Sequence, residues 1–147
     1  MQSEGEQNSD SGNATEQVRR EGSDILIVDD SLIILQTTSQ LLREEGYSVR
    51  TAVHGRDALD QILVQMPALI LLDLMMPVMD GWEFSRALRE VPGGDRPRVL
   101  ILSAVRGLAS DAHELGADGF LGKPYSVPDL LDRVEWALSH PRTMPAS

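Results

Sequence analysis

The chain has 147 residues, 41% of them hydrophobic and 4% aromatic, and a formal net charge of −10. The absence of cysteine excludes disulfides, zinc–thiolate sites and thiol catalysis. The acidic balance argues against a nucleic-acid surface, which needs clustered Lys and Arg. The longest apolar run, 68–72, is too short to span a bilayer, and the N-terminus has no secretory h-region. These features predict an aliphatic cytoplasmic domain of ordinary size.

The two ends of the chain differ in composition from the rest. Residues 1–23 are almost entirely polar or charged. They cannot bury enough apolar surface to offset the entropy lost on ordering, so we expect a disordered tail. The tail is interpreted as solubilising, with partner binding as the alternative. Residues 141–147 are expected to form a short frayed end, which leaves 24–140 as the folded domain.

From residue 24 onward, short β-rich apolar runs alternate with segments of helical period. Strands are expected at 25–28, 48–52, 69–72, 99–102 and 119–122. Helices are expected at 31–45, 55–65, 81–89, 108–115 and 127–139, and Gly46 and Gly116 stand where helix C-terminal glycines belong. Continuous apolar strands indicate a parallel sheet that is covered on both faces. The sequence therefore predicts an open, doubly wound α/β domain.

Polar side chains follow four of the five predicted strands. Asp29 and Asp30 follow the first strand, Asp73 the third and Ser103 the fourth, and Lys123 ends the fifth. In open parallel sheets, ligands bind beyond the carboxyl ends of the strands. We therefore expect these side chains to converge at one rim of the sheet. The second strand ends without a carboxylate, which is consistent with its lying at the sheet edge.

Each of these residues also has a simpler interpretation. Asp30 or Ser31 suits the N-cap of the first helix, and Ser103 suits a strand-end hydroxyl bonded to its own backbone. Asp73 alone could be a polar residue ending a buried strand, and Lys123 alone an ordinary surface charge. Their joint arrival at one edge of the sheet favours a functional site.

The charges at this rim indicate a divalent cation. Lys123 is the single lysine among 13 Lys and Arg residues, and it opposes three carboxylates. Mg²⁺ suits such a site, because it binds through one or two carboxylates and completes its coordination with water and phosphoryl oxygens. A metal, a free carboxylate, an ammonium group and a hydroxyl are the parts that phosphoryl transfer needs. Asp73 is the expected nucleophile, giving an aspartyl phosphate.

Four segments of the chain carry a resemblance to a known family. They are ILIVDDS at 25–31, LILLDLMMPVMDGWEF at 69–84, LILSA at 100–104 and GADGFLGKPYS at 116–126. Over residues 24–140 the chain resembles the receiver domain of two-component response regulators. The resemblance implies a flavodoxin-like sheet with strand order 2-1-3-4-5. The chain is interpreted as a stand-alone receiver without an output domain.

The resemblance also implies roles at the metal site. Asp73 would be the phosphoacceptor, and Asp30 and Asp73 would bind Mg²⁺ directly. Asp29 would act through a water molecule, and Met75 would contribute its backbone carbonyl.

By the same likeness, the rest of the site forms a switch. Ser103 would hydrogen-bond the phosphoryl group, and Lys123 would pair with another phosphoryl oxygen, with Pro124 fixing the turn. Phe120 would turn inward behind Ser103, although an ordinary core phenylalanine is the alternative. Phosphorylation would then shift the population toward the conformer that contacts the added charge.

Two features lie outside this pattern. The interval from Ser103 to Lys123 is about half a helical turn shorter than is customary, so the fourth helix is expected to be short or its loop tight. On the last helix, Trp136 is expected to lie opposite the apolar face. It is a candidate anchor for a partner or a second copy, or else it lies flat against Arg133.

The expected phosphodonor is a histidine kinase or a histidine phosphotransfer protein. The expected output is contact with a downstream protein or a phosphorylation-dependent dimer. The chain is expected not to be an enzyme, beyond catalysing its own phosphoryl transfer and slow dephosphorylation. The alternatives are a phosphorylation-independent interaction module and an Mg²⁺-dependent aspartyl-phosphate phosphatase. The phosphatase signature requires a second Asp two residues after the nucleophile, where this chain has Met75.

Overall fold

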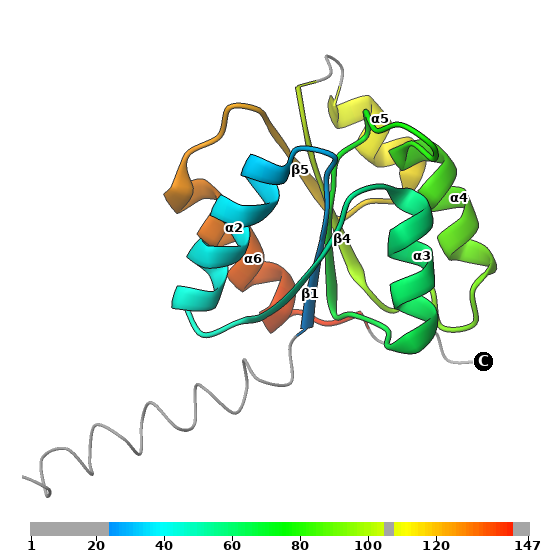
Figure 1. Cartoon of the computed structure of the whole chain (residues 1–147), viewed down its shortest axis with the longest axis horizontal. Coiled ribbons are helices and arrows are strands. Elements are labelled where there is room, and N and C mark those ends of the chain that lie inside the picture. The colour runs from blue at the N-terminus through cyan, green and yellow to red at the C-terminus, as the bar shows by residue number, and fades with distance from the viewer. Residues whose placement is uncertain (1–23, 105–107, 143–147) are drawn as a thin grey trace, which may run out of the picture.

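A five-stranded parallel sheet runs through the centre of the molecule (Figure 1). The computed structural model describes residues 24–104 and 108–142. The order of the strands is β2-β1-β3-β4-β5, which confirms the predicted topology and places β2 at one edge. The strands are β1 (Asp24–Val28), β2 (Ser48–Ala52), β3 (Leu69–Leu72), β4 (Arg98–Ser103) and β5 (Gly119–Gly122).

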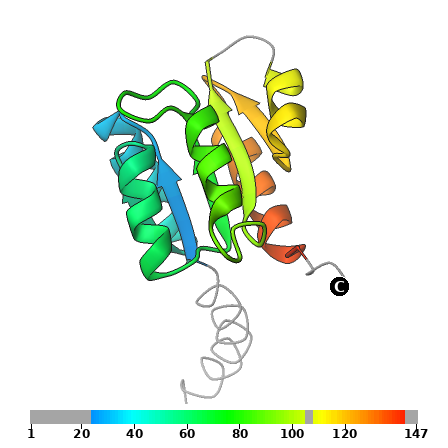
Figure 2. The ribbon, with the colours of Figure 1, turned by 90° about the vertical axis from the view of Figure 1, so that its right-hand side faces the viewer.

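Helices cover both faces of the sheet (Figures 1 and 2). One face carries α2 (Leu32–Glu44) and α6 (Val127–Ser139), and the other carries α3 (Gly55–Val64), α4 (Gly81–Glu90) and α5 (Leu108–Leu115). Each element starts and ends within one residue of its expected position. The tail predicted at 1–23 lies outside the described residues, as do residues 105–107 and all of the frayed end predicted at 141–147 except residues 141 and 142.

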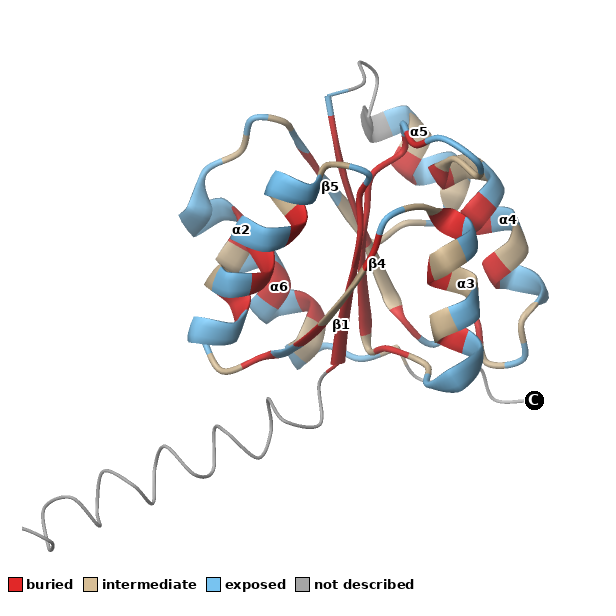
Figure 3. Cartoon of the chain, in the orientation of Figure 1, coloured by how far each residue is buried: buried red, intermediate tan, exposed pale blue. Residues whose placement is uncertain are grey.

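The core lies on both sides of the central strands. Every residue of β1 and β3 is buried (Figure 3), as expected for parallel strands covered on both faces. Ile25 and Ile27 belong to the cluster that α2 and α6 complete, whereas Leu26 and Val28 belong to the cluster completed by α3 and α4. The alternation of side chains along each strand thus anchors helices on both faces.

Capping residues fix the ends of the helices next to the sheet rim. Ser31 is the N-cap of α2, and its hydroxyl accepts a hydrogen bond from the Ile34 amide at 3.3 Å. The cap therefore falls on Ser31 and leaves Asp30 available. Gly46 and Gly116 have positive φ angles of 95° and 71°, the left-handed conformation that glycine favours at helix C-termini.

The outer edge of β2 is bonded to side chains from both helical layers. Alternate carbonyls of an edge strand face away from its neighbour. The carbonyl of Val49 accepts from Arg43 Nη2 of α2 at 2.9 Å, and that of Thr51 accepts from Gln61 Nε2 of α3 at 2.7 Å.

Within residues 24–104 and 108–142, no helix is both long and apolar enough to cross a bilayer.

Candidate functional site

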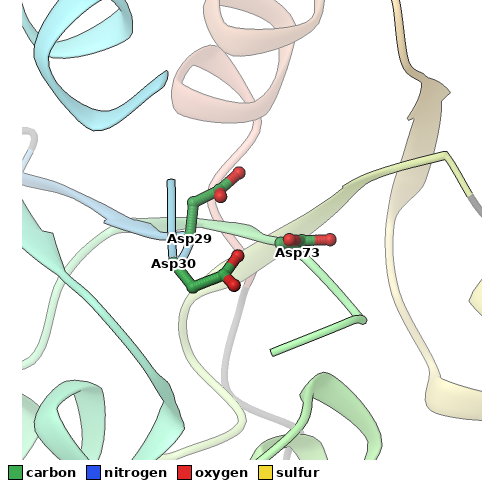
Figure 4. Close-up of side chains that lie close together, drawn as sticks. All are labelled: Asp29, Asp30 and Asp73. Carbon is green, nitrogen blue, oxygen red and sulfur yellow. The ribbon is translucent and has the colours of Figure 1, made fainter. Parts of the chain in front are cut away.

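Three carboxylates lie side by side at the carboxyl end of the sheet (Figure 4). Asp29 and Asp30 follow β1, and Asp73 follows β3, its hydrogen-bonded neighbour. The Asp73 amide donates to the Val28 carbonyl at 2.9 Å, so the hydrogen bonds between β1 and β3 continue into the site. One oxygen of each carboxylate lies within 4.8 Å of the others. The structure thus brings together the acidic residues that the sequence placed at separate strand ends.

Asp29 is held through both of its carboxylate oxygens. The side chain is 3% exposed; Oδ1 accepts from the Ser31 amide at 2.9 Å, and Oδ2 accepts from Lys123 Nζ at 2.6 Å. A buried carboxylate needs such partners, because an unpaired charge in the interior is costly. Asp30, in contrast, is exposed.

Asp73 is also buried, but its carboxylate has longer contacts with its partners. It is 6% exposed, Oδ1 accepts from the Met75 amide at 3.2 Å, and Oδ2 lies 3.7 Å from Lys123 Nζ. Lys123 therefore bonds primarily to Asp29 and only secondarily to Asp73.

The pKa of Asp73 is raised above its usual value. The largest cause is burial, which penalises the charged form, and the nearby charges of Asp29 and Asp30 add to it. Lys123 and the amide of Met75 oppose the rise without cancelling it. A carboxylate in this state gains from any added positive charge within reach, so the site favours a cation.

The end of β4 and the end of β5 deliver Ser103 and Lys123 to the same rim. Ser103 is fully buried, and its carbonyl accepts from the Lys123 amide at 2.9 Å. The peptide bond between Lys123 and Pro124 is cis. The carboxyl ends of β1, β3, β4 and β5 therefore contribute residues to one site.

Two glycines that the sequence analysis did not single out support the loop after β3. The Gly81 amide donates to the Leu74 carbonyl at 2.9 Å, and a Cβ on Gly81 would lie 2.8 Å from the Asp73 carbonyl oxygen. The Gly55 amide, at the start of α3, donates to the Met79 carbonyl at 3.2 Å. The signal for Gly81 was present as the Asp-Gly pair that begins α4, whereas the contact of Gly55 is visible only in three dimensions.

Phe120, the second expected switch residue, and Trp136, the candidate interface residue, are both partly exposed to solvent. Phe120 is 37% exposed, and its carbonyl accepts from Arg133 Nη1 at 3.0 Å. Trp136 is 45% exposed. Of the two interpretations of Trp136, flat packing against Arg133 is wrong: the guanidinium over its ring belongs to Arg98, at 4.9 Å, whereas Arg133 Nη1 donates to the Phe120 carbonyl. The ring of His140 stacks on Trp136 at 4.8 Å.

An apolar groove of about 720 Å³ extends from Lys123 away from the carboxylates. It lies between α2 and the first turn of α6, and its walls include Ile34, Leu41, Tyr125 and Val127. Val127 is among the exposed hydrophobic residues of the chain. The groove and the acidic cluster therefore share a boundary at Lys123.

Comparisons with known proteins agree with this geometry. The model of the response regulator receiver domain family matches residues 25–135. The response regulator MprA of Mycolicibacterium vanbaalenii is 40% identical over 123 residues, which are 82% of this chain and 52% of that protein. The chain thus spans about half the length of this curated relative.

Solved structures extend the likeness to the fold. The chemotaxis protein CheY4 of Vibrio cholerae is 33% identical with a TM-score of 0.73, and the match covers 78% of this chain and 98% of that one. The receiver domain of a Pseudomonas aeruginosa sensor histidine kinase, solved with a magnesium ion in its active site cleft, is 26% identical. That match has a TM-score of 0.73 and covers 80% of this chain and 98% of the other. By its sequence and its fold, the chain belongs to the response regulator receiver domain family.

Proposed function

We propose that this chain is a phosphorylation-controlled switch that accepts a phosphoryl group on Asp73 from a histidine kinase or a histidine phosphotransfer protein. The observation that carries the proposal is the buried Asp73 carboxylate with a raised pKa, clustered with two further carboxylates and one ammonium group. Receiver domains are phosphorylated by histidine kinases and are not classical enzymes. Signalling by protein contact in the cytoplasm is the corresponding output.

The donor set fits Mg²⁺. Hard oxygen ligands converge within 4.8 Å, and three negative charges face one positive charge. Asp30 and Asp73 would bind the ion directly, Asp29 would act through water, and Met75 would offer its carbonyl. When bound, Mg²⁺ would neutralise charge that develops on the phosphoryl oxygens.

The chain's own groups account for the transfer. A carboxylate oxygen of Asp73 attacks phosphorus, and a P–O bond forms while the P–N bond to the donor imidazole breaks. The electron pair of the broken bond returns to the imidazole. Lys123 then exchanges part of its interaction with Asp29 for a phosphoryl oxygen, and the Ser103 hydroxyl donates to another. Lys123 is already 3.7 Å from Asp73, so this exchange needs little movement.

The readout would follow from Ser103 and Phe120. Recruitment of Ser103 to the phosphoryl group would favour a conformer in which Phe120 turns from its exposed position toward the interior. Phe120 has no hydroxyl group, so packing would have to hold the inward state. The partner would therefore distinguish two shapes of the surface around β5.

The test is phosphorylation by a small-molecule phosphodonor with Mg²⁺, followed by intact-protein mass spectrometry. Wild type should gain one phosphoryl group, and Asp73→Ala should gain none. Asp132→Ala, which changes an exposed carboxylate on α6, is the matched control and should behave as wild type. Equal uptake by wild type and Asp73→Ala would reject Asp73 as the acceptor. Absence of uptake in both would favour a phosphorylation-independent interaction module.

A further inference from the structure

Asp118 forms a second, partly buried ionic cluster, at the end of the sheet opposite the acidic site. Its side chain is 8% exposed and precedes β5. Its carboxylate accepts from Arg98 Nη1 at 2.7 Å, from the Val99 amide at 2.8 Å and from Arg142 Nη2 at 2.8 Å. We call Asp118 with Arg98 and Arg142 the Asp118 clasp. Charge-assisted bonds to a buried carboxylate are among the stronger hydrogen bonds in proteins.

The clasp holds a short segment that follows α6, residues 140–142, which we call the strap. Arg98 Nε donates to the His140 carbonyl at 2.6 Å, and Arg142 Nη2 donates to the Gly116 carbonyl at 2.9 Å. In Figure 1 this segment, drawn in red, passes along the lower edge of the sheet from α6 toward the opposite layer. The strap therefore connects the end of α6 to the turn between α5 and β5.

The same turn is closed by backbone bonds and by a second arginine. Gly116 has a φ of 71°, and the Ala117 amide donates to the Ala112 carbonyl at 2.9 Å, as in a Schellman motif. Arg89 of α4 donates through Nη2 to the Leu115 carbonyl at 2.7 Å. The C-terminal end of α5 is thus held from α4, from β4 and from the strap.

The described side chains of α5, at 110–115, are less buried than those of α6. Among its described side chains, at 110–115, Ala112 alone is buried, and Leu115 is partly buried. In α6, by contrast, Leu130, Val134 and Ala137 are all buried. A helix with few buried apolar contacts moves at low free-energy cost.

We propose that the Asp118 clasp holds the C-terminal end of α5, its base, in place, so that this helix reorients by pivoting about Gly116. The strap determines how firmly this base is held. The pivot has a physical basis in the contrast between the C-terminal end of α5, which three arginines hold, and the described side chains at 110–115, of which Ala112 alone is buried. The event that would start the pivot, phosphorylation of Asp73, rests on the proposed function, whereas the clasp itself does not. A partner that engages the strap would then change the freedom of α5 from the far end of the sheet.

The clasp is tested by amide hydrogen exchange of the unphosphorylated protein. The amides of Gly116, Ala117 and Asp118 are all hydrogen-bonded and provide direct probes. Arg142→Ala should speed their exchange about tenfold relative to the Asp73 amide, because a charged hydrogen bond is lost. Arg86→Ala, which changes an exposed arginine of α4, should leave the exchange rates of these amides unchanged. Equal exchange at 116–118 in Arg142→Ala and wild type would overturn the clasp.

The pivot is tested with beryllofluoride and Mg²⁺, which mimic the phosphoryl group. In wild type, amide shifts should change at residues 110–112 and stay constant at 116–118; in Arg142→Ala the changes should spread to 116–118. Equal changes at both ends of α5 in wild type would overturn the pivot. If the amides around Asp73 do not respond, the proposed function fails, and with it the trigger of the pivot. The exchange rates without the mimic still decide whether the clasp exists.

Discussion

Lys123 shows how one side chain is shared between two carboxylates before any phosphoryl group arrives. It is bonded to Asp29 at 2.6 Å and is 3.7 Å from Asp73. An ammonium group is a compact charge on a flexible stem, whereas a guanidinium is a wide planar fork. A lysine can therefore move between neighbouring oxygens in a crowded site. This requirement explains why the position differs from the arginines used elsewhere in the chain.

At the same scale, the pKa of Asp73 predicts a pH dependence of stability. Because the folded-state pKa is raised, mainly by burial, the folded protein keeps a proton that the unfolded chain loses as pH rises. In the absence of Mg²⁺, the free energy of unfolding should therefore fall as pH rises from the usual Asp pKa through the raised one. Asp73→Asn removes this term and should be more stable than wild type near neutral pH.

Urea denaturation with a chelator present measures this difference. The gain of Asp73→Asn over wild type should shrink as pH is lowered toward about 3, below the usual Asp pKa, where the wild-type carboxyl is mostly protonated in both states. Asp132→Asn, on the exposed face of α6, is the control and should show no such gain. A variant that is less stable than wild type at neutral pH would contradict the prediction.

At the scale of elements, the start of α4 is fitted against the end of β3. A Cβ at Gly81 would lie 2.7 Å from the Leu74 Cα and 2.8 Å from the Asp73 carbonyl oxygen, both of them backbone atoms. Gly81→Ala should therefore displace the backbone that carries Asp73. We expect a loss of about 1–3 kcal/mol in unfolding free energy together with slower phosphorylation by a small-molecule donor.

Leu88→Ala separates these two effects. Leu88 is buried in the same helix, and its truncation should cost about 2–5 kcal/mol without moving the site. Under conditions where both variants remain folded, only Gly81→Ala should be phosphorylated slowly. Equal phosphorylation rates in the two variants would show that the close approach of Gly81 is unimportant for the site.

The sequence predicted the bounds of the helices and strands, and the convergence of carboxylates at the carboxyl ends of the strands, because both depend on local patterns. Apolar runs, terminal glycines and the geometry of parallel sheets suffice to place Asp29, Asp30 and Asp73 together. The pairing of Lys123 with Asp29 was not predicted, because it depends on rotamers that sequence does not specify. The anchoring of Arg142 was not predicted either, because its partners Gly116 and Asp118 are distant in sequence and a polar terminus carries no periodic signal.

At the scale of the whole molecule, we predict that a protein phosphodonor contacts the apolar groove beside Lys123 when it reaches Asp73. Val127→Asp places a charge in this groove at the first position of α6, where acidic residues suit the helix dipole. Transfer from a protein donor should fall about tenfold or more, the effect of about 1.4 kcal/mol of lost binding. Phosphorylation by a small molecule should not change.

The control for this prediction is Leu63→Asp, an exposed apolar position on α3 in the opposite layer; Leu63 is 69% exposed and Val127 49%. Both variants are compared by single-turnover transfer from the phosphorylated donor. If Leu63→Asp and Val127→Asp impair transfer to the same degree, the groove is not the contact surface.

The bonded edge of β2 restricts how copies of this chain can assemble. A free strand edge is a template on which identical sheets join into a continuous one. Here the outward carbonyls of Val49 and Thr51 are already occupied by Arg43 and Gln61. A second molecule would have to break both bonds before it could extend the sheet on this side. Copies of this chain are therefore expected to associate through surfaces other than this edge of the sheet.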